Sequence, residues 1–100
     1  MTLPKNRIVS HPGKILVEEF LEPLGLSANA LALALRVPAN RITGIIKGQR
    51  AVTADTALRL ARYFGTTAAF WVNLQGQYDL ERAADTVGRD IGRIKPVQAA

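Results

Sequence analysis

The feature that most constrains this chain is residues 25–50, which read GLSANALALALRVPANRITGIIKGQR. Apolar side chains recur at helical spacing on both sides of an interruption formed by Arg36, Val37 and Pro38. Proline cannot continue a helix, but it can stand at the start of the next one. The segment therefore predicts two short helices, about 28–35 and 39–47, joined by a tight turn.

The charge of this segment indicates the kind of surface that the two helices form. Every charged side chain in residues 24–53 is positive: Arg36, Arg41, Lys47 and Arg50. The whole chain has a net charge of +5, which favours an anionic partner, although many small domains are equally basic. The placement of the cations therefore carries more weight than their sum. A sharply turning helix pair with a cationic second helix is typical of a module that binds the DNA major groove.

Three further helices are predicted around this pair. Capping and apolar periodicity place them at about 12–23, with Ser10 or His11 as the cap, at 54–64, and after Thr66 or Thr67. The last helix should reach about residue 84 and, with fraying, residue 91. We therefore expect an all-α domain of five helices at 11–92, between a flexible arm at 1–10 and a flexible tail at 93–100.

The helix predicted at 39–47 separates apolar from polar side chains around its axis. Ile42, Ile45 and Ile46 fall on one side, and the opposite side carries polar residues with Arg41 at its flank. Arginine and lysine pair with guanine, asparagine pairs with adenine, and threonine contacts the thymine methyl group. Helix N-termini bind phosphates. The predicted DNA-binding residues are Ser27, Asn29, Arg36, Asn40, Arg41, Thr43, Gly44, Lys47 and Arg50.

Several of these residues also have a purely structural interpretation. Ser27 can serve only as an N-cap, and Arg36 and Lys47 can be solvated surface charges. Gly44 costs about 1 kcal/mol relative to alanine inside a helix. Either a close approach of its backbone to DNA or simple tolerance would explain its presence on the contact face.

The composition argues against catalysis. The chain has no cysteine, and its single histidine, His11, precedes Pro12 at a helix start, where capping or surface exposure is expected. Glu18 and Glu19 are adjacent and point about 100° apart on a helix, so they cannot act as one acid–base pair. Neither a phosphate-binding glycine loop nor a metal-ligand spacing occurs. We expect no enzyme, no cofactor and no metal.

Two further strings are informative: HPGKILVEEFLEPLGLS at 11–27, and LALALRVPANRITGIIKGQRAVTADTALRLARYFGTTAAFWVNLQGQYDL at 31–80. Together with RIKP at 93–96, they identify a resemblance to HigA-type antitoxins, in the Xre/Cro/C1 class of helix-turn-helix proteins. The resemblance implies a lambda-repressor-like fold. It also implies a protein that neutralises an mRNA-cleaving toxin of the HigB type and represses its own operon, binding palindromic double-stranded operator DNA as a homodimer.

The same resemblance implies roles for individual residues. Asn40, Arg41 and Thr43 would lie in the recognition helix. The final helices would form the dimer, and the predicted contacts are Phe70, Trp71, Leu74 and Tyr78. These side chains could instead pack against the first and fourth helices, an equally good interpretation for Trp71. Charge alone suggests that Glu18, Glu19 and Glu22 contact the toxin.

The sequence departs from the family pattern at three positions of the pair. Ala28 stands where relatives often carry a polar residue, and Ala39 and Gly44 stand where many carry arginine and glutamate. The recognition surface is accordingly smaller than usual. A stand-alone repressor without a toxin, and a protein-interaction module that never meets DNA, are the alternatives. The absence of a signal peptide-like or membrane-spanning apolar run predicts a cytoplasmic protein that binds no membrane.

Overall fold

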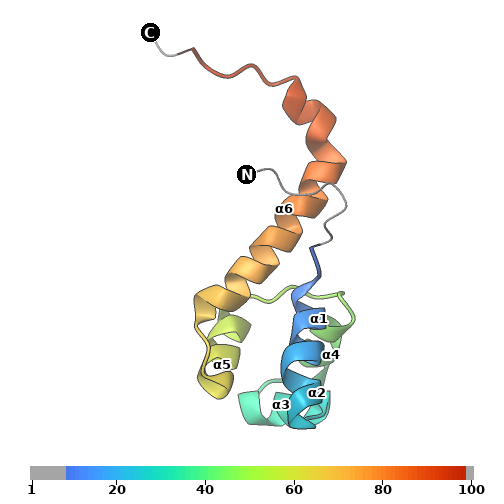
Figure 1. Cartoon of the computed structure of the whole chain (residues 1–100), viewed down its shortest axis with the longest axis vertical. Helices are drawn as coiled ribbons and strands as arrows, with labels where there is room; N and C mark the ends of the chain where they lie inside the picture. Colours follow the sequence, from blue (N-terminus) through green and yellow to red (C-terminus); the bar gives the residue numbers. More distant parts are fainter. Residues whose placement is uncertain (1–8, 99–100) are drawn as a thin grey trace.

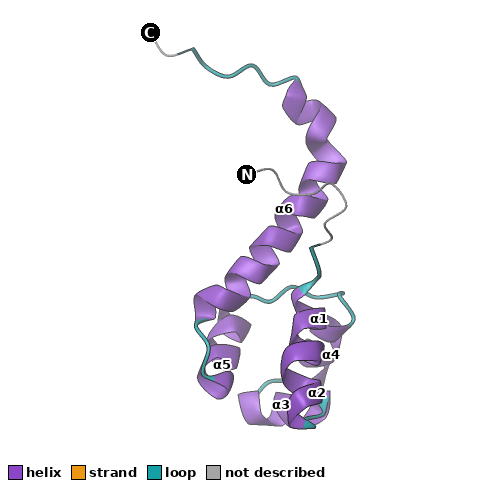
Figure 2. Cartoon of the chain, in the orientation of Figure 1, coloured by secondary structure: helices purple, strands orange, loops and turns teal. Residues whose placement is uncertain are grey.

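The computed structural model describes residues 9–98, and within them all regular secondary structure is helical (Figures 1 and 2). The first helix is continuous but comprises three labelled parts: α1 (Pro12–Ile15), η1 (Leu16–Leu21) and α2 (Glu22–Leu24). It is followed by α3 (Ala28–Leu35), α4 (Ala39–Ile46), α5 (Ala54–Phe64) and α6 (Ala68–Gly92). The prediction of five helices is confirmed. Of the predicted N-terminal arm, residues 1–8 lie outside the described residues.

Two local features shape the first helix. His11 is its N-cap, because Nδ1 of the ring accepts a hydrogen bond of 2.9 Å from the Gly13 N–H, which decides between His11 and Ser10. The wide π-helical turns of η1 end at Leu21, two residues before Pro23, and the Glu22 N–H donates to the carbonyl of Val17. In a regular α-helix the ring of Pro23 would clash with the carbonyl four residues earlier. The widened turns therefore keep the helix continuous up to this proline.

The start of the first helix lies unusually close to the end of α4. A Cβ atom built on Gly13 would overlap the carbonyl of Ile45 and come within 3.0 Å of the Cα of Ile46. No other residue type fits this backbone contact. Gly13 thereby fixes the position of α4 against the rest of the domain.

The turn between α3 and α4 consists of Arg36, Val37 and Pro38. Arg36 has a φ of 62°, the only positive φ of a non-glycine residue within residues 9–98. It caps α3 in the left-handed conformation, and the Val37 N–H then donates to the Ala32 carbonyl at 3.0 Å. Pro38 follows with extended backbone and precedes α4. The predicted break is therefore a three-residue turn.

The core lies between the first helix, α3, α4, α5 and the first turns of α6. Its largest fully buried side chains are Trp71, Leu16, Leu31, Ile42, Ile45 and Leu60. The indole N–H of Trp71 donates to Thr66 Oγ1 at 2.8 Å, while Thr67 caps α6. Buried Gln75 accepts a 2.8 Å hydrogen bond from the Val52 N–H and so ties the loop after α4 to α6.

The second half of α6 leaves this core. Residues 79–92 are exposed along their whole length, and the helix projects well beyond the other helices (Figure 1). The helix is thus longer than its contacts within the chain require. None of the helices within residues 9–98 is long and apolar enough to cross a membrane.

Candidate nucleic-acid interface

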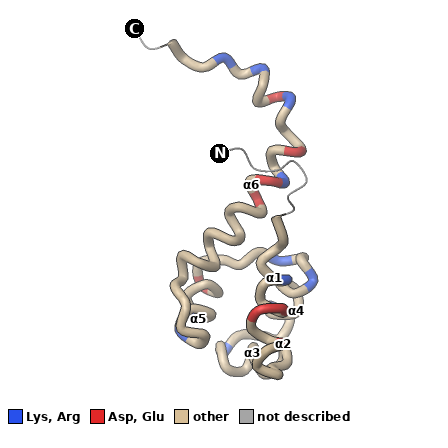
Figure 3. Tube along the Cα trace, in the orientation of Figure 1, with Lys and Arg blue, Asp and Glu red and all other residues tan. Residues whose placement is uncertain are grey.

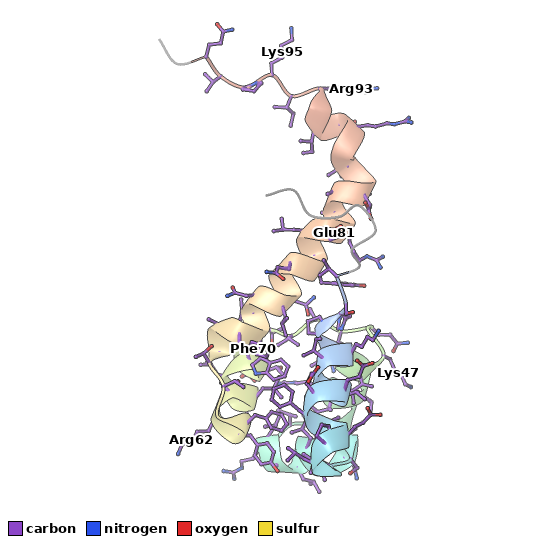
Figure 4. The ribbon with its side chains drawn as sticks, viewed as in Figure 1. Lys47, Arg62, Phe70, Glu81, Arg93 and Lys95 are labelled. Atoms are coloured by element: carbon purple, nitrogen blue, oxygen red, sulfur yellow. The ribbon has the colours of Figure 1, made fainter. Side chains whose placement is uncertain are left out.

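The helix α4 presents a narrow polar face. Its buried residues are Ile42, Gly44 and Ile45, whereas Asn40, Thr43 and Lys47 are exposed. These three exposed side chains follow i, i+3, i+7 spacing and therefore lie along one side of the helix. Lys47 points away from the body of the molecule (Figure 4). The geometry suits a helix whose inner side is anchored in the core and whose outer side is free for a ligand.

Arg41, at the flank of this face, is held by a carboxylate. Its Nη1 lies 2.8 Å from Oδ1 of Asp55, in the first turn of α5, and its side chain is 32% exposed. Asp55 is the one residue within 9–98 to which the Arg41 guanidinium donates. The cation is therefore accessible but not free.

Asp55 also binds a second arginine. Nε of Arg59 lies 2.8 Å from the same Oδ1 atom, and Nη1 of Arg59 donates to the Leu35 carbonyl at 2.8 Å. The hydrogen bond from Arg59, and then the charges of Arg59 and Arg41, hold the pKa of Asp55 below its usual value. The pair of Asp55 and Arg59 thus connects α5 with the start of α4 through Arg41 and with the end of α3 through the Leu35 carbonyl.

Asp55 and Arg59 are not among the binding residues predicted from the sequence. Their spacing of four residues is a signal for an ion pair on one helix. No sequence signal indicates that Arg41, fourteen residues before Asp55, joins them. That contact depends on the tertiary fold, which brings the start of α5 within reach of the Arg41 side chain.

The prediction that Gly44 lies on the contact face is wrong. The residue is buried, and a Cβ atom on it would lie 2.5 Å from Cδ and 2.6 Å from Cγ of Arg50. Its carbonyl accepts the N–H groups of Gln49 at 2.9 Å and Arg50 at 3.1 Å. Gly44 therefore gives space for the loop after α4 and for the stem of Arg50.

The other predicted phosphate contacts lie at the edges of the helix pair. Ser27 Oγ accepts the Ala30 N–H at 3.0 Å and is the N-cap of α3. Asn29 and Arg36 are exposed. Arg41 and Arg50 line one small hollow of about 110 Å³ between α4 and the start of α5.

The loop after α4 is basic and carries Lys47 and Arg50, and the first helix has an acidic segment (Figure 3). Along α6, acidic and basic segments alternate. Glu18, Glu19 and Glu22 are all exposed. A polyanion would therefore meet basic side chains at α4 and its following loop, with the Asp55 carboxylate beside Arg41 at their edge.

The aromatic residues predicted for dimerisation have different positions. Trp71 is 0% exposed within a single chain, so the prediction that it forms a dimer contact is wrong, and its indole is part of the core. Phe70 turns toward the cluster of Phe20 and Trp71 but stays 38% exposed (Figure 4). Leu74 and Tyr78 are partly buried, and the Tyr78 ring lies 4.9 Å from that of His11.

Five helices, a three-residue turn between α3 and α4, and an exposed polar face on α4 define a helix-turn-helix protein. The helix-turn-helix family model HTH_3 matches residues 17–71. The chain is 56% identical over 86 residues to virulence-associated protein I of Dichelobacter nodosus, covering 83% of this chain and 80% of that protein. It is 37% identical over 97 residues to antitoxin HigA-1 of Vibrio cholerae, covering 97% and 90%.

A solved structure gives the same result. The Pseudomonas aeruginosa antitoxin HigA, determined with the higBA promoter, superimposes with a TM-score of 0.87 at 44% identity, over 91% of this chain and 100% of that one. The chain belongs to the HTH_3 family of helix-turn-helix DNA-binding proteins, and within it to the HigA antitoxins. The lambda-repressor-like fold predicted from the sequence is confirmed, and the family is not one of enzymes.

Proposed function

We propose that this protein is the antitoxin of a toxin–antitoxin pair and that it represses its own operon by binding operator DNA as a homodimer. The observation that carries the proposal is the exposed face of Asn40, Thr43 and Lys47 on a helix anchored by Ile42 and Ile45. The similar Pseudomonas aeruginosa HigA was determined with promoter DNA, which supports the same role for this fold here.

In this proposal α4 enters the major groove. Asn40, Thr43 and Arg41 contact base edges near the start of the helix, and Lys47 and Arg50 contact phosphates beyond its end. Ser27, Asn29 and the free N–H groups at the start of α3 hold a phosphate of the flanking backbone, and Arg36 adds a peripheral cation. Two subunits would read half-sites about one turn apart, or ~10 bp.

The exposed half of α6 supports the homodimer. Its apolar side chains Leu80, Ala84, Val87 and Ile91 are all exposed and follow spacings of four, three and four residues. This spacing forms the seam of a coiled coil, which requires a second helix to cover it. A second copy of α6 is the partner we propose, with Phe70, Leu74 and Tyr78 at the base of the interface.

The acidic side of the first helix supports toxin binding. Glu18, Glu19 and Glu22 form an exposed negative surface that complements a basic RNA-cleaving protein. Replacing all three with glutamine should weaken neutralisation of a co-expressed toxin. Undiminished neutralisation by this variant would remove these residues from the toxin interface.

A mobility-shift titration tests the DNA-binding half of the proposal. The purified protein is titrated against DNA from immediately upstream of its gene and against unrelated DNA of equal length, at two salt concentrations. We expect tighter binding to the upstream fragment and a steep loss of affinity with salt, because phosphate contacts release counterions. Equal affinity for both fragments would contradict sequence-specific repression, and binding to neither fragment would favour the protein-interaction module.

A growth assay separates the antitoxin from a stand-alone repressor. A neighbouring small basic open reading frame, expressed alone, should arrest growth, and co-expression of this protein should restore it. Selective binding to the upstream fragment without such a toxin would favour the stand-alone repressor.

A further inference from the structure

We propose that Asp55 is a specificity-determining residue of the DNA interface: it holds the guanidinium of Arg41 and keeps this cation from acting as an unspecific phosphate contact. The inference rests on the proposed DNA binding. It assigns a role in recognition to a residue on α5, outside the helix-turn-helix pair.

Arg41 lies where its guanidinium can reach DNA, so restraining this side chain affects DNA binding. Arg41 is in the first turn of α4, the part of a recognition helix that meets base edges. Its side chain is 32% exposed, so DNA can reach the guanidinium, yet Nη1 is 2.8 Å from the Asp55 carboxylate. A flexible arginine at this point would contact the backbone of any DNA sequence.

The carboxylate that restrains Arg41 is itself held in place. Arg59 donates to the same oxygen of Asp55 at 2.8 Å and also donates to the Leu35 carbonyl at the end of α3. Asp55 and Arg59, four residues apart on α5, thus contact both helices of the pair. Arg41 is therefore presented from a fixed point and not by a freely rotating side chain.

The charge balance predicts which DNA is affected. Unrelated DNA is bound almost entirely through phosphates, so its affinity depends on every available cation, whereas an operator also supplies base contacts. Asp55 neutralises part of the charge of Arg41 and so lowers the affinity for unrelated DNA more than the affinity for the operator. Removing this carboxylate should reduce the ratio of the two affinities.

The test is Asp55→Asn, which removes the negative charge and keeps the size of the side chain. Affinities for the upstream fragment and for unrelated DNA are measured by fluorescence anisotropy between about 50 and 200 mM salt. We expect the affinity for unrelated DNA to rise roughly three- to eightfold near 0.1 M salt, and the salt dependence to steepen by about one counterion. The ratio of operator to unrelated affinity should fall by at least about threefold.

Two controls separate this role from a change in net charge. Asp85→Asn makes the same change of charge on the exposed half of α6 and should leave the ratio unchanged. The double variant Arg41→Ala/Asp55→Asn should bind unrelated DNA as Arg41→Ala does, because the released cation is absent. Thermal unfolding checks that Asp55→Asn is folded, and Asp55→Ser, which keeps a side chain favoured in a first helical turn, replaces it if it is not.

The outcomes distinguish the inference from the proposed function. Wild-type protein that does not prefer the upstream fragment contradicts the proposed function, while the salt dependence on unrelated DNA still decides whether Asp55 restrains Arg41. A second outcome overturns the inference alone. In it the wild-type protein prefers the upstream fragment, but the Asp55 variants show the same ratio of operator to unrelated affinity and the same salt dependence as the wild type. The inference is also overturned if the affinity for unrelated DNA rises equally when Asp55→Asn is made in the Arg41→Ala background, or if it rises equally in Asp85→Asn.

Discussion

At the scale of single residues, His11 joins three parts of the molecule. Its ring accepts the Gly13 N–H at 2.9 Å, packs edge-on against Tyr78 and lies near Gly48 in the loop after α4. Burial lowers the pKa of His11, while a hydrogen bond with the backbone of Arg50 and the charge of Asp79 act in the opposite direction. The folded state therefore favours the neutral ring, which alone can accept the capping hydrogen bond.

This preference makes folding stability depend on pH. Between the lowered pKa of the folded state and about 6.5, the unfolded chain binds more protons, so the free energy of unfolding rises as pH rises. The contribution of His11 to this free energy is fully present above about pH 6.5, and it is lost as pH falls through the pKa of the folded state. Urea unfolding of the wild type should give lower stability at about pH 5.5 than at about pH 7.5.

His11→Asn is the matched variant, because asparagine also accepts a capping hydrogen bond but does not titrate. Its stability at about pH 7.5 should be within about 1 kcal/mol of the wild type, and its dependence on pH over this range should be much smaller. His11 is the single histidine of the chain, so no other side chain has an ordinary pKa between these two pH values. An unchanged pH dependence in the variant would contradict the assignment to His11.

At the scale of the helices, most boundaries could be predicted from the sequence. Pro12, Ser27, Thr53 and Gly65 mark helix ends by their own backbone and capping chemistry, and each of them stands at a helix end in the structure. These signals are local, so they do not depend on the rest of the fold. Periodicity likewise assigned Ile42 and Ile45 to the core.

Contacts between helices could not be predicted in the same way. Periodicity indicates which face of a helix is buried, but not which residue of another helix lies opposite. The sequence pattern therefore predicts the wrong surface for Gly44, since the stem of Arg50 covers it, and it contains no signal for the pairing of Arg41 with Asp55. The π-helical turns of η1 also have no signal beyond the nearby Pro23.

The contact of the first helix with α4 gives a prediction at this scale. Gly13→Ala should lower the free energy of unfolding by about 1–3 kcal/mol, because its Cβ atom would overlap backbone atoms that cannot rotate away. Gly88→Ala on α6 is the control. No atom lies within 4 Å of its added Cβ, so it should stabilise the helix by roughly 0.5–1 kcal/mol. Chemical denaturation measures both, and an undisturbed Gly13→Ala variant would refute the close contact.

The polar face of α4 gives a second prediction at the scale of the helix. Asn40→Ala should cost about 1–3 kcal/mol on the operator and relax the preference at one base pair, because its amide is proposed to read a base edge. Lys47→Ala should weaken binding to every sequence and reduce the salt slope by about one. Anisotropy titrations on single-base operator variants distinguish the two patterns. Equal losses on all sequences for Asn40→Ala would make it a backbone contact instead.

At the scale of the whole molecule, the exposed half of α6 gives a prediction that tests the proposed homodimer. Within residues 9–98, the side chains of Leu80, Val87 and Ile91 are 73%, 39% and 55% exposed, and they line one side of a helix that no other part of the chain covers. A charge in the middle of this stripe would be buried without a partner in a dimer, but it would stay hydrated in a monomer. The cost therefore falls on association alone.

Val87→Glu should accordingly shift the protein toward a monomer in sedimentation equilibrium while its helicity and thermal unfolding of the core stay near those of the wild type. Operator affinity should fall by at least tenfold, since each subunit would bind one half-site without its partner. Thr86→Glu adds the same charge to a different side of the helix and should remain dimeric. A dimeric Val87→Glu variant would exclude the exposed apolar side of α6 as the interface. It would favour a dimer formed by Phe70, Leu74 and Tyr78 at the base of α6.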